Sequence, residues 1–382
     1  MPVLEPWKLP YGGASVVEGA EYIQLFQASE AIGVYNMSPM ISYFHSRFLA
    51  TWKNSPENED QPGQRVLYSQ SMDGRNWTFA NSGERILFPN ISTNAVPTAL
   101  FAEPTLLLNN RVYAAASPIQ FCLYPDQYQP YLLLREVFDE FDSFGPVFWA
   151  SWEVPLKYLE NSEIHQIISL SAMPSYVQQD VALLNVTSPT YRPCDPNQQE
   201  GHSIKCEYCP NGCQNWTDVG VSTIENERTH YLLPNSTGDV ILYRNKAQVP
   251  NHLYASVRMP LNAPWPPVAE TNITDDVANL NAGNLPDGRA FLVSNAMVNY
   301  ARDPLFISTT DSTNLRFVAT QVLVSCHFDV FKPLGCVKRF SGSTQAGCQY
   351  PQALVINEVG FLTIFSLNKE DIWLVLAPLS SI

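Results

Sequence analysis

The chain has 382 residues, of which 45% are hydrophobic, and its formal net charge is −14. A chain of this length can bury a full hydrophobic core, which excludes a small scaffold held together by disulfides. The negative charge repels nucleic-acid phosphates and anionic membrane surfaces, and no run of 18 apolar residues is present. We therefore expect no nucleic-acid partner, no membrane association and no membrane-spanning helix.

Short alternating runs of apolar and polar residues follow one another along the chain, and they predict β-strands with little helix. The strands fall into groups near residues 38–79, 103–150, 181–190, 229–268, 279–318 and 350–379. Residues 20–36, together with strands that the pattern does not locate, imply one further unit. Helices are expected only between strand groups, near residues 136–142 and 155–170.

Three of these groups share one plan. Residues 229–258, 284–310 and 350–377 each read as strand, tight polar turn, strand, loop and strand. Such a unit buries its faces only when its neighbours stack against it, which is typical of radial β architecture. We predict an all-β fold, namely a seven-bladed β-propeller with six blades as the alternative, formed by a single domain over residues 1–382. The C-terminal strands are expected to complete a sheet with N-terminal ones.

A short turn motif supports the propeller. Residues 71–77 read Ser-Met-Asp-Gly-Arg-Asn-Trp and match the S-x-D-G-x-x-W Asp-box of sialidase-type propellers. Asp73 and Gly74 are expected to form the turn between the third and fourth strands of a blade, and Trp77 to pack between sheets. A degraded copy occupies residues 310–317. Both motifs are interpreted as structural.

Cysteines and glycosylation sequons indicate a secreted, extracellular protein. The chain has eight cysteines and seven Asn-x-Ser/Thr sequons, although Pro39 makes the first sequon, at Asn36, doubtful. The N-terminal residues lack an apolar signal core, so a leader is expected to have been removed.

Four of the cysteines lie in a Cys-rich insertion at residues 191–220, where two local disulfides are favoured over a zinc site. Cys326 is predicted to pair with Cys336, which leaves Cys122 to pair with Cys348.

Strand direction determines which side chains meet at each face of a propeller. The first strand of each unit begins at one face, and the loop from second to third strand lies there too, whereas the turn with His45 lies on the opposite face. The residues assigned to the first face are His230, Arg244, His252, Asn279, Asn281, Asn284, Tyr300, Arg302, Tyr350, Asn368, Lys369, Tyr35, Asn36 and the loop 53–64. This face is the predicted site.

Several of these segments resemble one enzyme family. These segments are residues 43–77, residues 281–296 with RDPLFISTT, and YPQALV with FSLNKEDIWLV. They resemble propeller enzymes that act on rhamnosyl-glucuronate ends of plant gums. These enzymes were first described as rhamnosidases and later as rhamnose-glucuronate lyases, and ulvan lyases are more distant relatives. The resemblance leaves out residues 150–225. Many relatives carry Asn-His-His-Pro where this chain has Asn36-Met-Ser-Pro39, so the histidine proposed there for hydrolysis is absent, which favours the lyase.

The resemblance implies β-elimination of terminal L-rhamnose from α-1,4-linked glucuronate on an anionic plant polysaccharide. A lyase must neutralise the uronate carboxylate and remove the proton at C5. Arginines suit the first task, and a neutral histidine or tyrosine suits the second. Arg244 and Arg302 are the candidates for binding the uronate carboxylate, with Arg192 as a third arginine. His230 and His252 are assigned as base and acid, and the alternative proton donors are Tyr231, Tyr300 and Tyr350. Asn284, Tyr350 and Lys369 are expected to contact the sugar.

Other interpretations stay open for the same residues. Each histidine alone is also consistent with an ordinary surface loop, and Arg302 with a structural brace to Asp303 or Glu370. Glu57, Glu59 and Asp60 read as a solvated loop or as oxygen ligands for calcium. Otherwise no metal or cofactor is expected, and the protein is expected to be a monomer.

Two other functions compete with the lyase. One is a glycoside hydrolase of the exo-rhamnosidase or sialidase type; a sialidase would need three convergent arginines and a tyrosine activated by a glutamate, for which Glu103, Glu225 and Glu227 are candidates. The other is a carbohydrate-binding propeller without catalysis.

Overall fold

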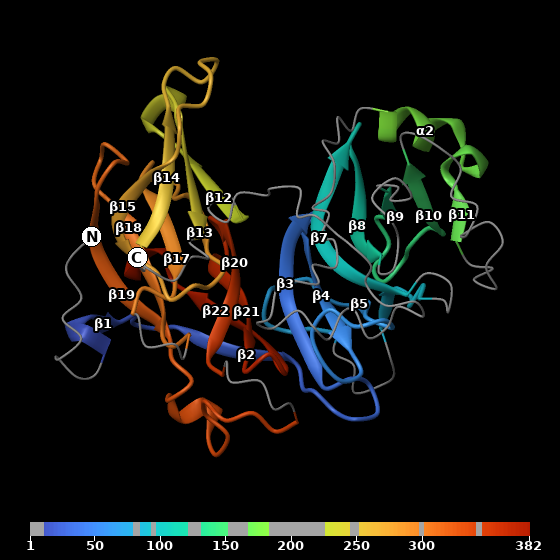
Figure 1. The fold of residues 1–382 in the computed structure, drawn as a ribbon, viewed down its shortest axis with the longest axis horizontal. Helices are drawn as coiled ribbons and strands as arrows, with labels where there is room; N and C mark the ends of the chain where they lie inside the picture. Colours follow the sequence, from blue (N-terminus) through green and yellow to red (C-terminus); the bar gives the residue numbers. More distant parts are fainter. Residues whose placement is uncertain are drawn as a thin grey trace, which may run out of the picture.

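The computed structural model describes residues 11–78, 85–92, 97–120, 131–151, 167–182, 226–244, 252–297, 302–340 and 346–382. Within these ranges the chain forms five sheets of four or five strands and one α-helix. Figure 1 shows β12–β15 and β16–β19 on one side of the molecule and β3–β5 and β7–β11 on the other, with β20–β22 between them. The predicted all-β class is confirmed.

The five sheets follow the order of the chain. The first contains β3 (Tyr35–Phe44), β4 (Arg47–Ser55), β5 (Arg65–Ser71) and β6 (Ile86–Phe88). The second contains β7 (Thr98–Leu108), β8 (Arg111–Gln120), β9 (Tyr131–Val137), β10 (Val147–Ser151) and β11 (Ile167–Ser169). The third contains β12 (Asn226–Leu232), β13 (Asp239–Arg244), β14 (His252–Arg258) and β15 (Ala269–Thr274).

The last two sheets each include an N-terminal strand. The fourth contains β16 (Asn281–Asn284), β17 (Ala290–Ser294), β18 (Leu305–Thr310), β19 (Phe317–Val324) and the short β1 (Ser15–Val16). The fifth contains β20 (Cys348–Ile356), β21 (Gly360–Leu367), β22 (Asp371–Ala377) and β2 (Glu21–Phe26). The helical elements are α2 (Ser175–Ala182) and the 3₁₀ turns η1 (Tyr11–Gly13), η3 (Leu170–Ala172), η5 (Pro234–Ser236), η6 (Asp329–Phe331) and η7 (Leu379–Ser381).

The N-terminal strand β2 pairs with the C-terminal strand β22 in antiparallel register, from Glu21 opposite Leu376 to Gln24 opposite Trp373. This pairing confirms the expected completion of a C-terminal sheet by N-terminal residues. It also shows that the separate unit predicted at residues 20–36 was wrong, because β2 is the fourth strand of the last sheet. The prediction of seven blades counted this unit as a blade, so that reason for it is removed. Most of the segment between β11 and β12 lies outside the described residues, so the blade count stays a prediction.

Tight turns join the first two strands of several sheets. His45 (φ 46°) and Ser46 (φ 57°) connect β3 to β4, and Asn109 (φ 45°) and Asn110 (φ 64°) connect β7 to β8. Two consecutive residues with positive φ match the right-handed twist of a hairpin, and asparagine tolerates this conformation well.

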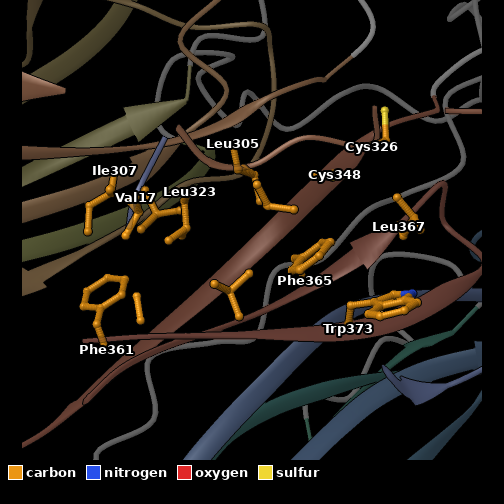
Figure 2. Close-up of a cluster of buried hydrophobic side chains, with 14 of the residues drawn as sticks. Val17, Leu305, Ile307, Leu323, Cys326, Cys348, Phe361, Phe365, Leu367 and Trp373 are labelled. Atoms are coloured by element: carbon orange, nitrogen blue, oxygen red, sulfur yellow. The ribbon is translucent and has the colours of Figure 1, made fainter. Parts of the chain in front are cut away.

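Neighbouring sheets share hydrophobic cores. One core joins the fourth and fifth sheets, and Figure 2 shows Leu305, Ile307 and Leu323 facing Phe361 and Trp373 across it. Similar cores join the third sheet to the fourth, the fifth to the first and the first to the second. This face-to-face stacking in chain order is the arrangement that the repeated unit predicts.

The Asp-box forms the predicted turn. The backbone N–H groups of Arg75 and Asn76 donate to Asp73 Oδ1 (2.8 and 2.7 Å), and Trp77 Nε1 donates to the Gly74 carbonyl (2.9 Å). Trp77 packs against the core between the first and fifth sheets. In the degraded copy, Phe317 occupies the corresponding place between the third and fourth sheets.

The predicted helix at residues 136–142 was wrong. Glu136 and Val137 belong to β9, where Glu136 pairs with Tyr113 of β8, because long-range sheet pairing overrides a local helical pattern. Residues 152–166 lie outside the described residues, and residues 167–170 are β11 and the start of η3. The structure instead places α2 later, and its Asp180 accepts hydrogen bonds from Asn109, Arg111 and Tyr113 of the second sheet.

The cysteine predictions have mixed outcomes. Cys326 and Cys336 form the predicted disulfide, with their Cα atoms 5.1 Å apart. Cys348 is a buried free thiol, so the predicted pair with Cys122 was wrong. Its thiol lies against the Asp303 carboxylate, and burial raises its pKa well above the ordinary value. The Cys-rich insertion at 191–220 lies outside the described residues. Among the described helices, none is long and apolar enough to cross a membrane.

Candidate active site

The candidate site lies at the face where the first strand of each sheet begins. The first strands β12, β16, β20, β3 and β7 contact one another in this order, so side chains at their starts converge from separate sheets. The ends of the second strands and the loops that follow them lie at the same face. The predicted grouping by strand direction therefore has a physical basis in the observed topology.

Left-handed backbone conformations occur at this face as well as in the hairpin turns at the opposite face. Seven non-glycine residues at the site face have φ between 47° and 61°, namely Ser38, Asp60, Val277, Arg302, Tyr350, Asn368 and Lys369. For residues other than glycine this conformation costs on the order of 1 kcal/mol each, and it persists where the surroundings hold it in place. Register shifts in β3 (Met37/Met40) and β20 (Gln349/Gln352) add bulges at the same end. Bulges and strained residues of this kind aim side chains into functional sites.

Two arginines from different sheets meet at Tyr350. Nη1 of Arg244, at the end of β13, donates to the Tyr350 hydroxyl (3.3 Å). The Arg302 guanidinium, before β18, lies 5.7 Å from the centroid of the Tyr350 ring. Both arginines are buried. This group of Arg244, Arg302 and Tyr350 is called the arginine–tyrosine group below.

Arg302 is held rigidly. Its Nη1 donates to Gln349 Oε1 (2.7 Å), its Nη2 to the Val277 carbonyl (3.0 Å), and its backbone N–H to Asp276 Oδ2 (2.9 Å). The braces to Asp303 and Glu370 that the sequence left open are replaced by these contacts. Because these hydrogen bonds already fix the side-chain conformation, the guanidinium can bind an anion without a further loss of side-chain entropy.

A second charged group lies beside the first. Lys369, in the turn between β21 and β22, pairs with Glu59 (Nζ–Oε2 2.9 Å), and Lys53 of β4 contacts Glu59 (3.4 Å) and Asp60 (3.3 Å). Lys53 also lies 4.3 Å from the centroid of the Phe101 ring. Both lysines are buried.

Burial opposes the charge of each lysine, but the outcomes differ. For Lys53, Asp60 and Glu59 outweigh burial and raise its pKa. For Lys369, burial together with the Arg302 charge exceeds the attraction of Glu59, and its pKa is lowered. The interpretation of Glu59 and Asp60 as a solvated loop was wrong, because lysines meet both carboxylates. Among the described residues, one set of metal-type ligands gathers, Asp303, Cys326, His327 and Cys336, and the disulfide already joins two of them.

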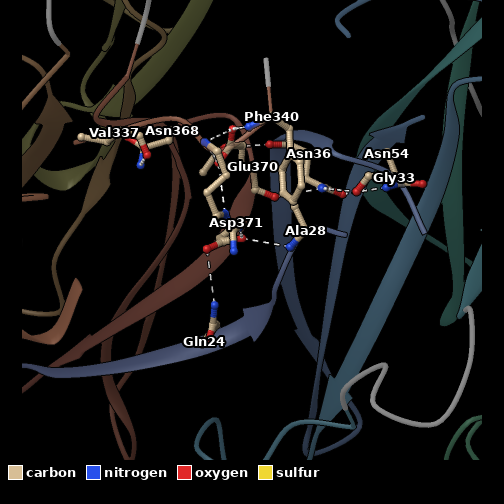
Figure 3. Close-up of polar contacts among 12 residues, drawn as sticks. Gln24, Ala28, Gly33, Asn36, Asn54, Val337, Phe340, Asn368, Glu370 and Asp371 are labelled. Atoms are coloured by element: carbon tan, nitrogen blue, oxygen red, sulfur yellow. Dashed lines mark hydrogen bonds and ion pairs between the residues drawn. The ribbon is translucent and has the colours of Figure 1, made fainter. Parts of the chain in front are cut away.

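Asn36 ties the first and fifth sheets together at the site. Its Nδ2 donates to the carbonyls of Gly33 (3.3 Å) and Glu370 (2.9 Å), and its Oδ1 accepts from Asn54 Nδ2 (2.9 Å). Figure 3 shows this chain of contacts running from Asn54 through Asn36 to the β21–β22 turn. The Asn36 backbone N–H donates to the Lys369 carbonyl (2.8 Å), so Asn36 positions Lys369. Asn36 is fully buried, which removes the first sequon as a glycan acceptor.

The predicted histidines lie apart from the arginine–tyrosine group. His230 was placed at the start of its strand, but β12 begins at Asn226, and His230 is exposed opposite Ile241. Ile241 is three residues from Arg244, about 10 Å along the strand. His252 begins β14 and is level with Arg244, but its Nδ1 contacts Glu270 Oε1 (2.8 Å) on the outer strand β15. No contact joins either histidine to the group within the described part of the chain.

Tyr231 and Asn284 have structural surroundings. Tyr231 is buried between the third and fourth sheets against Phe317, and burial raises its pKa far above the ordinary value. Asn284 was placed on the site face, but it ends β16 on the opposite face and bridges to the backbone of Leu232 (2.8 and 2.9 Å). Its predicted position was therefore wrong. Tyr300 and Arg192 lie outside the described residues.

The comparisons with known proteins agree with this architecture. A family model described as a BNR repeat-like domain matches residues 176–364, just under half of the chain. No curated protein matches the sequence. Among solved structures, a sialidase is similar with a TM-score of 0.63 and 19% identity over 96% of this chain. The chain spans 34% of the length of that sialidase.

Two further structures are similar over most of the chain. A protein of unknown function from Dyadobacter fermentans has a TM-score of 0.52 and 12% identity, covering 94% of this chain and all of its own. The Trypanosoma rangeli sialidase bound to 2,3-difluorosialic acid as a covalent intermediate has a TM-score of 0.50 and 10% identity, covering 95% of this chain and 59% of its own. At these identities the solved structures show that the chain shares their fold, and the family model places a BNR repeat-like domain within it.

Proposed function

We propose that the protein is a carbohydrate-active enzyme whose central site binds the carboxylate of an acidic sugar and cleaves a glycosidic bond beside it. The observation that carries this proposal is the convergence of Arg244 and Arg302 on Tyr350. Two buried guanidiniums provide charge-assisted hydrogen bonds for a carboxylate, and their burial strengthens each bond. The net charge of the protein is −14, so its overall electrostatic field repels anions. This local positive group attracts them in spite of that repulsion.

The proposed reaction is the elimination of terminal L-rhamnose from glucuronate on plant gum. Arg244, Arg302 and Lys369 would neutralise the glucuronate carboxylate, which makes the C5 proton acidic enough to remove. Tyr350 would accept the C5 proton as its phenolate, on whose oxygen the Arg244 hydrogen bond stabilises negative charge. The C4–O bond then breaks, a C4–C5 double bond forms, and Tyr350 returns the proton to the departing rhamnose oxygen. This assignment puts Tyr350 ahead of His230 and His252, whose roles stay untested predictions.

Hydrolysis of the sialidase type is the second candidate, and the carboxylates at the site favour it. A sialidase needs a tyrosine beside a glutamate and arginines that bind the sugar carboxylate. Glu59 lies in the same charged face as Tyr350 and is bonded to Lys369. Tyr350 would then attack the anomeric carbon, and its proton would pass through Glu59 to the departing oxygen as the glycosidic bond breaks. Water would next displace Tyr350 from the sugar and return the proton to it.

Product analysis separates these functions. Wild-type protein is incubated with gum arabic and, separately, with 3′-sialyllactose. Elimination releases rhamnose and raises the ultraviolet absorbance of an unsaturated uronate, whereas hydrolysis releases rhamnose or sialic acid without that absorbance. Arg302→Ala is expected to lose about 10²-fold or more in activity, and Arg316→Ala, an exposed arginine outside the site, serves as the matched control. Binding of either glycan without any product would support the non-catalytic alternative and contradict the enzyme.

We further propose that the protein acts outside the cell as a monomer. Four sequon asparagines are exposed and accessible to a glycan, Asn76, Asn90, Asn235 and Asn272. Mass spectrometry of the protein from its native source, before and after glycosidase treatment, tests the extracellular location, and light scattering of the protein in solution tests the monomer.

A further inference from the structure

The loop that joins β14 to β15, residues 259–268, is called the tryptophan loop below. It lies at the opposite end of the third sheet from the candidate site, because β14 begins at His252, level with Arg244, and ends at Arg258. A strand of seven residues spans about 20 Å, so the loop is about that far from Arg244. Figure 1 shows the loop projecting from the sheet beyond β14 and β15. The loop therefore takes no part in the central site.

Trp265 of this loop is held in one orientation. The Arg258 guanidinium lies 4.2 Å from the centroid of the Trp265 ring. Arg258 is itself fixed by two hydrogen bonds to the Asp239 carboxylate, from Nε to Oδ1 (2.9 Å) and from Nη2 to Oδ2 (2.8 Å). The buried Ser256 ties the loop to β14, because its Oγ donates to the Pro266 carbonyl (2.8 Å). The indole ring therefore rests on a fixed cation and forms a rigid aromatic platform.

The rest of the indole ring is accessible to a ligand. Trp265 is 37% exposed, and its Nε1–H has no hydrogen-bond acceptor among the residues that the structure describes. Met259 and Leu261 of the same loop are exposed as well (66% and 37%). Residues 259–268 contain no ionisable side chain. An exposed apolar surface of this kind marks an interaction site, and its lack of charge favours a neutral partner over an ionic one.

We propose that Trp265 is the centre of a second carbohydrate-binding site, which stacks on neutral sugar rings of the polysaccharide that the protein cleaves. This inference rests on the proposed function. A pyranose ring presents C–H groups on its flat faces and hydroxyls around its edge. It can therefore stack on the open face of the indole while one hydroxyl accepts a hydrogen bond from Nε1–H. Because the ring of Trp265 is already fixed, binding costs little conformational entropy.

A branched polysaccharide can occupy both sites at once. The central site binds an acidic sugar at the end of one branch, and the tryptophan loop binds a neutral ring of another branch. Since the second contact forms within an existing complex, the protein binds the polymer more tightly than it binds the acidic sugar alone. Loss of Trp265 should therefore weaken binding of the polymer and leave the affinity for the single sugar unchanged. A purely structural role of Trp265 would not produce this difference.

Two binding measurements test this, affinity electrophoresis in gels that contain gum arabic and titration calorimetry with the methyl glycosides of glucuronate and sialic acid. Trp265→Ala is expected to bind gum arabic about tenfold more weakly than wild type and to bind the methyl glycosides equally well. Trp265→Tyr keeps an aromatic ring and is expected to retain most of the affinity for gum arabic. Phe141→Ala is the matched control, because Phe141 is an exposed aromatic residue (44%) in the loop after β9, and it should behave as wild type in both measurements.

The outcomes separate the inference from the function on which it rests. If Trp265→Ala binds gum arabic like wild type while Arg302→Ala loses the acidic sugar, the second site is refuted and the central site stands. If Trp265→Ala weakens binding of gum arabic but wild type binds neither methyl glycoside, the central site fails and the second site stands. Equal weakening for gum arabic and the methyl glycoside would place the effect of Trp265 in the fold and refute the proposal.

Other partners for the tryptophan loop give different results. A dimer of wild type in light scattering that is absent in Trp265→Ala would assign the loop to contact with a second copy. Sedimentation of wild type, but not of Trp265→Ala, with phosphatidylcholine vesicles would assign it to a lipid surface. Either result without a change in binding of gum arabic would refute the proposal. Thermal unfolding of each variant, expected to match wild type, shows that a loss of binding is local.

Discussion

Replacing Asn36 by alanine should destabilise the protein by a predictable amount. The change removes three buried side-chain hydrogen bonds, to Gly33, Glu370 and Asn54. Each is worth about 1 kcal/mol net, and the partners are left in a buried place, so the loss is about 3 kcal/mol. With an unfolding entropy of about 2.1 cal/mol/K per residue, a chain of 382 residues should unfold about 4 °C lower.

Thermal unfolding followed by circular dichroism measures this shift. Asn357→Ala is the matched control, because Asn357 is exposed in the turn between β20 and β21 and should leave the unfolding temperature within about 1 °C. Because the Asn36 side chain also holds the Glu370 carbonyl next to Lys369, binding of the acidic sugar should weaken as well. An unfolding temperature for Asn36→Ala equal to that of the control would refute the reasoning that this residue joins the first and last sheets.

Two further predictions concern stability. Although burial opposes the charge of Asp180, hydrogen bonds from Asn109, Tyr113 and Arg111 hold its pKa below the ordinary value; its contribution to stability is therefore present above about pH 4 and lost as the pH falls below that. Asp180→Asn should flatten this acid-side decline in the free energy of unfolding, and a urea-unfolding series from pH 3 to pH 6 that shows the same decline in both proteins would contradict it. The double change of Cys326 and Cys336 to serine should lower the free energy of unfolding by about 3 kcal/mol, as expected for a loop of this length, and an unchanged urea midpoint would contradict it.

Strand direction predicted that Arg244, Arg302 and Tyr350 lie on one face, and the structure brings them together there. Arg244 ends a second strand, Arg302 precedes a third strand, and Tyr350 lies near the start of a first strand. The errors came from strand boundaries. His230 was taken as the start of a strand that begins four residues earlier, at Asn226, and Asn284 as the start of a strand that it ends.

Other features of the site could not be read from the sequence. The loop with Glu59 and Asp60 has the composition of a solvated loop, and its role depends on Lys369, which lies more than 300 residues away in the chain. Residues 326–340 lie between repeats and follow no strand pattern, so their place depends on hydrogen bonds to Asn368 and Glu370. Loop contacts of this kind arise from tertiary packing, and local patterns carry little signal for them.

The central claim is that the arginine–tyrosine group recognises a sugar carboxylate. The most direct measurement compares the affinity of wild type, Arg244→Ala and Arg302→Ala for the methyl glycosides of glucuronate and sialic acid with their affinity for neutral methyl glucoside. We predict that wild type prefers one acidic sugar over the neutral one by at least about tenfold, and that both variants lose this preference. Equal binding of acidic and neutral sugars by wild type, or an undiminished preference in both variants, would contradict the account.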